Sequence, residues 1–168
     1  MGNRTERHRV IAEEHIRAHQ AMTEAQIAGR APVSRRSLIK PGVRVFMPQT
    51  GERIVHNSIY GEQDPVDGAL KELRMFWARI PDFGIKEFAV FPAESGWVQV
   101  LKWSGTGEDG TFWAAQEASA YETDAVFEVT RIEIYSDTAQ WMAVAAYATG
   151  SDPATFGVED YFAAVAAA

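Results

Sequence analysis

Acidic and histidine side chains supply the candidates for chemistry in this sequence. Glu117 lies in a stretch from Thr111 to Tyr121 with the apolar composition of a β-strand. Because alternate residues of a strand face the same side, one face carries these residues: Trp113, Ala115, Glu117, Ser119 and Tyr121. On a buried face, loss of solvation raises a carboxyl pKa towards the range that suits proton transfer. Glu117 is therefore the candidate acid–base residue, unless the face is solvated or Lys102 on the neighbouring strand neutralises it.

His15 and His19 lie four residues apart in a helical pattern, with Glu14 beside them. This spacing lets two imidazoles bind one metal ion. The sequence offers no convincing third ligand, so an amphipathic helix is the preferred interpretation and no metal is predicted. His15 falls within the apolar stripe of the helix, where it either lines a cavity or is hydrogen-bonded in the core.

Three further polar groups follow other strand-like stretches. His56, Asn57 and Tyr60 are either donors to a pocket or residues of a surface turn. Arg131 and Glu133 share one face of the last predicted strand, where we expect a structural ion pair.

The run from Gly105 to Gly110 matches the G-x-G-x-x-G spacing of dinucleotide-binding loops. That chemistry needs a helix N-terminus after the loop to receive the pyrophosphate. Since the following stretch is a predicted strand, the run is interpreted as a hairpin turn, and no cofactor is predicted.

The composition excludes several classes of protein. The chain has 168 residues and no cysteine, which rules out disulfides, thiolate metal sites and a cysteine nucleophile. Its formal net charge of −7 lacks the excess of basic residues with which proteins bind the phosphates of nucleic acid. No apolar run is long enough to span a bilayer, and the start lacks the apolar core of a secretory signal. We therefore expect a cytoplasmic protein with no nucleic-acid or membrane partner.

Helical patterns come first in the chain. One runs from Thr5 to Ala28, with its apolar stripe formed by Ile11, His15, Ala18, Met22 and Ala25. A short helix over residues 34–40 and a small hairpin around Gly51 follow. A further helix begins after the N-cap residue Asp64, with Pro65 as its first residue.

Strands dominate the second half. Four are predicted: Ile85 to Phe91, Trp97 to Ser104, Thr111 to Tyr121 and Val126 to Tyr135. Their short links permit hairpins but not crossover helices, so they form an antiparallel meander. An alanine-rich helical tail covers residues 138–148 and 158–167. This order predicts an α+β fold, a single domain over residues 1–168 whose curved sheet packs over the N-terminal helices and encloses a cone.

Several stretches resemble the SnoaL-like and ketosteroid-isomerase-like branch of the nuclear transport factor 2-like superfamily, whose members are cone-shaped α+β barrels. The stretches are Ile80-Pro81-Asp82-Phe83, Val98 to Gly107 and Tyr121 to Asp137, and the resemblance covers roughly Glu6 to Ala148. It implies a match between the oxyanion-hole acid of ketosteroid isomerases and Glu117, and places their helix-one tyrosine near His15.

Two acids of that branch have no counterpart here. The general-base carboxylate of ketosteroid isomerases falls at Met47, and the late-strand acid of epoxide hydrolases and cyclases falls at Ile134. The resemblance therefore implies neither an ordinary steroid isomerase nor a limonene-type epoxide hydrolase.

The sequence favours a cofactor-independent isomerase, cyclase, dehydratase or lyase that acts on an apolar, aromatic or polycyclic small molecule. Glu117 would shuttle a proton, His15 or His56 would serve as second acid–base group, and Tyr60 would polarise the substrate. The expected stacking surface consists of Phe46, Trp77, Trp103, Trp113 and Tyr121. The alternative is a non-catalytic module, whose cone binds a ligand or is filled. The resemblance implies a homodimer in either case, and the tail closes the cone or lies on the partner subunit.

Overall fold

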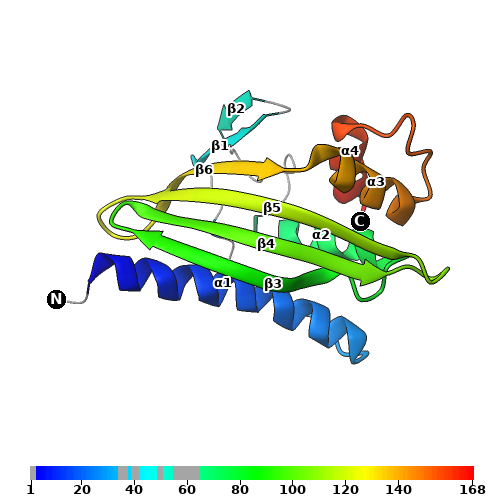
Figure 1. The fold of residues 1–168 in the computed structure, drawn as a ribbon, viewed down its shortest axis with the longest axis horizontal. Coiled ribbons are helices and arrows are strands. Elements are labelled where there is room, and N and C mark those ends of the chain that lie inside the picture. The colour runs from blue at the N-terminus through cyan, green and yellow to red at the C-terminus, as the bar shows by residue number, and fades with distance from the viewer. Residues whose placement is uncertain (1–2, 34–37, 39–41, 49–50, 55–64) are drawn as a thin grey trace.

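The computed structural model describes residues 3–33, 38, 42–48, 51–54 and 65–168. Figure 1 shows a sheet with helices along one edge and at one end. The elements are α1 (Arg4–Ile27), β1 (Arg44–Met47), β2 (Gly51–Ile54), α2 (Pro65–Trp77), β3 (Gly84–Ala93), β4 (Gly96–Thr106), β5 (Phe112–Thr123), β6 (Val129–Ser136), α3 (Thr138–Thr149) and α4 (Val158–Ala167). The predicted α+β class is confirmed, whereas the short helix predicted over residues 34–40 lies largely outside the described residues.

The sheet has the strand order β2-β1-β6-β5-β4-β3. The predicted antiparallel meander from β3 to β6 is confirmed, and so is the β1–β2 hairpin. Sequence reasoning did not foresee that β1 pairs in parallel with β6, with Val45 opposite Ile132. This pairing extends the meander with the short β1–β2 hairpin and gives a mixed sheet.

The buried side of α1 differs from the predicted stripe. Asn3 caps the helix by accepting a hydrogen bond from the Thr5 amide at 2.9 Å. The buried residues are His8, Ala12, Ile16, Ala18, Met22 and Thr23. Ala18 and Met22 were predicted, but Ile11, His15 and Ala25 are only half-buried. His8 and Thr23 can take buried positions because they form hydrogen bonds with groups of β3, β5 and the loop before β3. The buried stripe of α1 is therefore rotated around the helix axis relative to the predicted one.

One side of the sheet, called here the inner face, packs against the helices. On β4 it carries Trp97, Gln99, Leu101 and Trp103, which alternate with exposed or half-buried neighbours. Two hydrophobic clusters lie on this side. The first includes Leu101, Trp103 and Ala115 with residues of α1, α2, α3 and α4, and the second includes Trp97, Tyr121, Val45 and Ile132.

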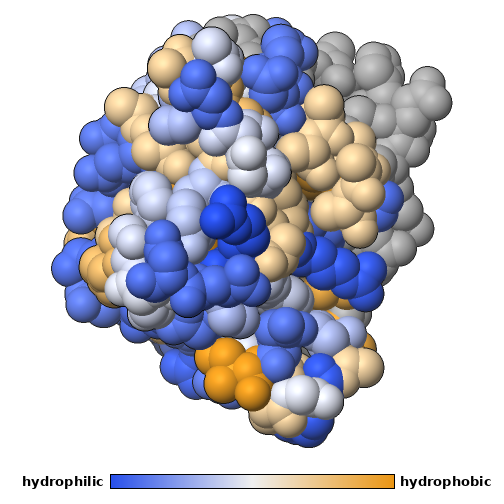
Figure 2. Space-filling model, turned by 90° about the vertical axis from the view of Figure 1, so that its right-hand side faces the viewer, coloured by the Kyte–Doolittle hydropathy of each residue, from blue (hydrophilic) through white to orange (hydrophobic). Residues whose placement is uncertain are grey.

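The alanine-rich tail packs back on its own chain. Asp137 caps α3 by accepting from the Gln140 amide at 3.2 Å, and Gly150 ends it in a left-handed conformation. Val144 of α3 and Val165 of α4 join the first cluster with Phe76 of α2. Figure 2, which views the molecule from this end, shows hydrophilic and hydrophobic surfaces intermixed. Of the helices described, none combines the length and the apolar character needed to cross a membrane.

Candidate functional site

The inner face of β5 carries a row of polar groups between the two hydrophobic clusters. Ser119 is fully buried, Tyr121 is 6% exposed, and Glu117 is half-buried. The only register shift between β5 and β6 falls between Glu122 and Thr123, beyond this row. The strand therefore alternates regularly from Trp113 to Tyr121, and the carboxylate lies on the same side as the buried rings.

Glu117 has apolar or neutral residues beside it on both neighbouring strands, since it pairs with Leu101 on β4 and Ser136 on β6. Lys102 lies on the outer side of β4, where its amine forms an ion pair with Glu87 at 2.7 Å. None of the ion pairs between described residues involves Glu117. The anticipated neutralisation by Lys102 is therefore absent.

The environment of Glu117 alters its acidity. Burial raises the pKa of the carboxyl group above its ordinary value, and the hydrogen bond donated by the Ser119 hydroxyl to Oε1 partly opposes this rise. A carboxyl group with a raised pKa holds its proton closer to neutral pH. It is thus suited both to accept and to return a proton.

Two further residues of the site, Trp97 and Gln99, were not singled out from the sequence. Trp97 Nε1 donates to Gln99 Oε1 at 3.2 Å, and Gln99 Nε2 donates to the Tyr121 hydroxyl at 3.3 Å. The Trp97 and Tyr121 rings stack with their centroids 4.5 Å apart. Burial first, and then the charge of Glu117, raise the pKa of Tyr121, so its hydroxyl stays protonated. The sequence signal was the polar residue at position 99 on an otherwise apolar strand face.

His15 and His19 form a half-buried pair on α1, with ring centroids 4.6 Å apart. His19 Nδ1 donates to the His15 carbonyl oxygen at 3.1 Å, which leaves Nε2 as the acceptor of the neutral ring. Burial lowers the pKa of both histidines, and for His15 the neighbouring His19 lowers it further. Both rings are therefore neutral at pH 7. Within the described ranges, no three His, Cys, Asp or Glu side chains are grouped to hold a metal ion.

The predicted aromatic residues lie in different places. Trp103 contacts His19, with centroids 6.3 Å apart, and belongs to the first cluster. Trp113 is half-buried at the far end of the Glu117 face. Trp77 is buried in the core, where its Nε1 donates to the Phe83 carbonyl oxygen at 2.9 Å.

Phe46 lies on the outer side of the sheet. It pairs with Glu133 of β6, and its ring lies 6.2 Å from that of Tyr135, whereas Val45 takes the inner position. The alternation of β1 thus separates Phe46 from Glu117 by the thickness of the sheet. His56 and Tyr60 lie outside the described residues.

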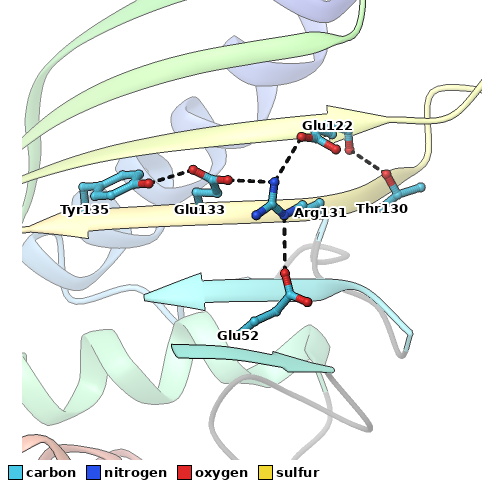
Figure 3. A network of polar contacts seen from close by, with 6 residues as sticks. All are labelled: Glu52, Glu122, Thr130, Arg131, Glu133 and Tyr135. Carbon is cyan, nitrogen blue, oxygen red and sulfur yellow. Dashed lines mark hydrogen bonds and ion pairs between the residues drawn. The ribbon is translucent and has the colours of Figure 1, made fainter. Parts of the chain in front are cut away.

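The predicted ion pair of Arg131 and Glu133 is confirmed and belongs to a larger network (Figure 3). Arg131 lies 2.7 Å from Glu133, 3.4 Å from Glu122 and 3.6 Å from Glu52 of β2. The Tyr135 hydroxyl donates to Glu133 at 2.7 Å. This network ties β2, β5 and β6 together on the outer side, away from Glu117.

The glycine-rich run is a hairpin turn, as predicted. The Gly107 amide donates to the Thr111 carbonyl oxygen at 2.9 Å, and β5 follows directly. No helix N-terminus stands after the run to receive a phosphate.

Comparison with known proteins gives structural similarities only, because no family model and no curated protein matches the chain. A protein from Jannaschia sp. CCS1 assigned as a SnoaL-like polyketide cyclase is 8% identical, with a TM-score of 0.44, over 83% of this chain and 94% of that chain. A nuclear transport factor 2-like protein from Burkholderia thailandensis E264 is 16% identical, with a TM-score of 0.45, over 77% and 95%.

A third structure comes from Catenulispora acidiphila DSM 44928, a protein with a ketosteroid isomerase-like fold in complex with trimethylamine. It is 12% identical, with a TM-score of 0.46, over 83% of this chain and 97% of that chain. With identities of 8 to 16% and TM-scores below 0.5, these likenesses do not assign the chain to a family, so its chemistry is argued from its own residues.

Proposed function

We propose that this protein is a cofactor-independent acid–base enzyme, an isomerase, cyclase, dehydratase or lyase, acting on an apolar, aromatic or polycyclic small molecule. The observation that carries the proposal is the half-buried carboxylate of Glu117, which faces the helices, has a raised pKa and forms no ion pair with a described residue. A structural acid in such a place would ordinarily be paired with a cation.

The simplest reaction for such a group is proton transfer next to a carbonyl. The Glu117 carboxylate takes the proton of a carbon–hydrogen bond, and the bonding electrons move onto the carbonyl oxygen. The protonated carboxyl group then returns the proton to another carbon, or the carbanion closes a ring or expels a leaving group. Protons and electrons balance within the substrate, so the isomerisation needs no oxidant or cofactor.

The other proposed roles follow from charge. His15 is neutral because burial lowers its pKa, so it acts as a hydrogen-bonding group that polarises a substrate oxygen and adds no charge. His56 and Tyr60 remain proposed as further donors. Trp103, Trp113 and Tyr121 are the proposed stacking surface, since flat rings favour planar aromatic guests.

The test measures proton exchange, which does not require the product to be known. The protein is incubated in D₂O with a panel of cyclic and aromatic ketones, and deuterium incorporation is followed by mass spectrometry. We expect Glu117→Gln to lower the exchange rate by about 10²-fold or more, the usual contribution of a positioned acid or base. Glu133→Gln, which alters a carboxylate of the outer face, is the matched control and should retain the wild-type rate.

If Glu117→Gln exchanged as fast as the wild type on a ketone that the protein processes, the acid–base role would be refuted. A protein that binds such ketones without exchange would instead support the non-catalytic module.

We also propose that the protein forms a homodimer through the outer face of the sheet. Phe91, Val98 and Tyr135 are large apolar or aromatic residues exposed on that side, at 59%, 41% and 45%. Light scattering of the purified protein should give twice the mass of 18.6 kDa. Val98→Glu should shift this mass to that of the monomer, and a wild-type monomer would contradict the proposal.

A further inference from the structure

The five tryptophans of the chain differ in whether their indole N–H groups are bonded. Three donate to an acceptor: Trp77 to the Phe83 carbonyl oxygen at 2.9 Å, Trp97 to Gln99 Oε1 at 3.2 Å and Trp141 to the Gln116 carbonyl oxygen at 3.1 Å. The Nε1 atoms of Trp103 and Trp113 are buried, and the residues that the structure describes give them no acceptor. Two donors of the inner face are therefore left without the bond that the other three have.

Trp103 is the more deeply placed of the two, since it is 7% exposed whereas Trp113 is half-buried. The Trp103 ring stacks on Phe83, with centroids 6.1 Å apart, and meets the rings of His19 and Trp141 edge-on at 6.3 and 5.7 Å. These neighbours hold the ring in place without bonding its nitrogen. An indole N–H group can only donate, and buried donors in native proteins are nearly always bonded. The nitrogen of Trp103 therefore indicates an acceptor beyond the described residues.

Trp103 lies next to the candidate acid. It pairs with Ala115 of β5, and Glu117 is the next residue along the same face of that strand, so Trp103 and Glu117 are diagonal neighbours. Diagonal neighbours on a sheet are about 7–8 Å apart, a distance that long side chains can span. Ala115, between them, carries only a methyl group. One planar guest molecule is therefore long enough to contact both the indole N–H group and the carboxyl group.

We propose that the indole N–H group of Trp103 binds the carbonyl oxygen of the guest beside Glu117, and that the substrate is a neutral ketone. This inference rests on the proposed function, because it names the substrate group that lies beside the acid. A carbonyl oxygen offers lone pairs and no proton, which suits a donor that cannot accept. Its second lone pair remains for His15, the polarising group already proposed on α1.

The charges around the site argue against an anionic guest. Lys102, the cation of β4, pairs with Glu87 on the outer side, and His15 and His19 are neutral. An anion would therefore gain no partner from these groups and would be repelled by the carboxylate of Glu117. Because Trp103 Nε1 is buried, the ring has to shift slightly as the guest binds, which is common for side chains at binding sites.

The test follows the indole N–H signals of protein labelled with nitrogen-15 tryptophan by NMR. The probes are β-tetralone, a ketone for the same panel, and its matched hydrocarbon tetralin. Because a hydrogen bond deshields the proton, β-tetralone should move the Trp103 signal downfield, and tetralin should not. The signals of Trp77 and Trp97, whose N–H groups are already bonded, are the internal controls and should stay in place.

Trp103→Phe keeps an aromatic ring and removes the N–H group. The smaller ring affects both probes alike, so the readout is the ratio of the β-tetralone affinity to the tetralin affinity. This ratio should fall about fivefold, the value of one hydrogen bond. Trp77→Phe is the matched control, because it removes an indole N–H group from the core, where the Phe83 carbonyl oxygen still accepts from the Thr23 hydroxyl at 3.5 Å. It should leave the ratio unchanged.

A ketone that binds without a downfield shift of the Trp103 signal would overturn the inference, and so would an unchanged ratio in Trp103→Phe. Failure of every ketone of the panel to move the signal at millimolar concentration would overturn it as well. The NMR measurement needs no catalysis, so its result is separate from that of the exchange assay. Exchange with an unmoved Trp103 signal would remove the ketone donor and leave the proposed function standing, whereas a shifted signal without exchange would do the reverse.

Discussion

Replacing His8 by alanine should destabilise the protein more than any substitution on the exposed side of α1. His8 is fully buried, and both ring nitrogens are bonded. Nδ1 donates to the Ala93 carbonyl oxygen at 2.7 Å, and Nε2 lies 2.7 Å from the Thr123 hydroxyl. The ring also contacts Trp97 and Phe127, with centroids 6.0 and 5.3 Å apart. The side chain thus joins α1 to the ends of β3 and β5.

The magnitude follows from these contacts. Two hydrogen bonds are worth about 1 kcal/mol each, and the cavity left by a buried side chain adds about 2 kcal/mol. We therefore expect the free energy of unfolding to fall by about 4 kcal/mol in His8→Ala, a large part of the roughly 5–15 kcal/mol typical of a domain.

Urea unfolding followed by tryptophan fluorescence measures this loss. The neighbouring substitution Arg7→Ala, on the exposed side, should change the free energy of unfolding by less than about 0.5 kcal/mol. Thr123→Val removes one of the two bonds and should cost about 1 kcal/mol, most of which should vanish in the His8→Ala background. If His8→Ala lost less than about 1 kcal/mol, the ring would not anchor the helix.

The remaining predictions concern pH and packing. Because burial raises the pKa of Glu117, its contribution lowers the free energy of unfolding as the pH rises from the ordinary pKa of 4.5 through the raised pKa. Urea unfolding at pH 4 and pH 8 measures this loss, and Glu117→Gln should abolish it. His15 has a lowered pKa, so stability falls as pH drops below 6.5, and His15→Gln should retain more stability at pH 5. In Gly105→Ala the new Cβ would meet the Phe83 backbone at 2.8 Å, which should cost about 2–3 kcal/mol by thermal unfolding. Gly110→Ala, with φ +82° and open space, should cost only about 1 kcal/mol.

The meander could be predicted from the sequence because its signals are local. Each strand of β3 to β6 alternates over a short run, and turn residues separate neighbouring runs. The parallel pairing of β1 with β6 joins Val45 to Ile132, far apart in the chain, and no local pattern specifies it. This pairing decides that Phe46 lies on the outer side of the sheet. The sequence alone therefore could not remove Phe46 from the predicted stacking surface.

The buried side of α1 was misjudged for a related reason. His8 and Thr23 are polar, and hydrophobic periodicity assigns such residues to solvent. Their burial is possible because partners on other elements satisfy them: the Ala93 carbonyl for His8, and the Phe83 carbonyl at 3.5 Å for Thr23. These partners become visible only in the folded structure, so the predicted stripe favoured Ile11 and Ala25 instead.

The position of Glu117 bears on the choice between an enzyme and a filled, non-catalytic cone. Because side chains alternate along β4, Leu101 lies opposite Glu117, whereas Lys102 points to the outer side and pairs with Glu87. The ammonium group of Lys102 therefore cannot offset the cost of burying the Glu117 carboxylate. A cone that only needed filling would be more stable with an apolar residue at this position. Instead, this position holds Glu117, and the Ser119 hydroxyl donates a hydrogen bond to its carboxylate, which stabilises the charged form of the group. A half-buried carboxyl group with a raised pKa and no ion pair to a described residue is suited to proton transfer and is disfavoured by packing alone, and this contrast supports the proposed acid–base enzyme.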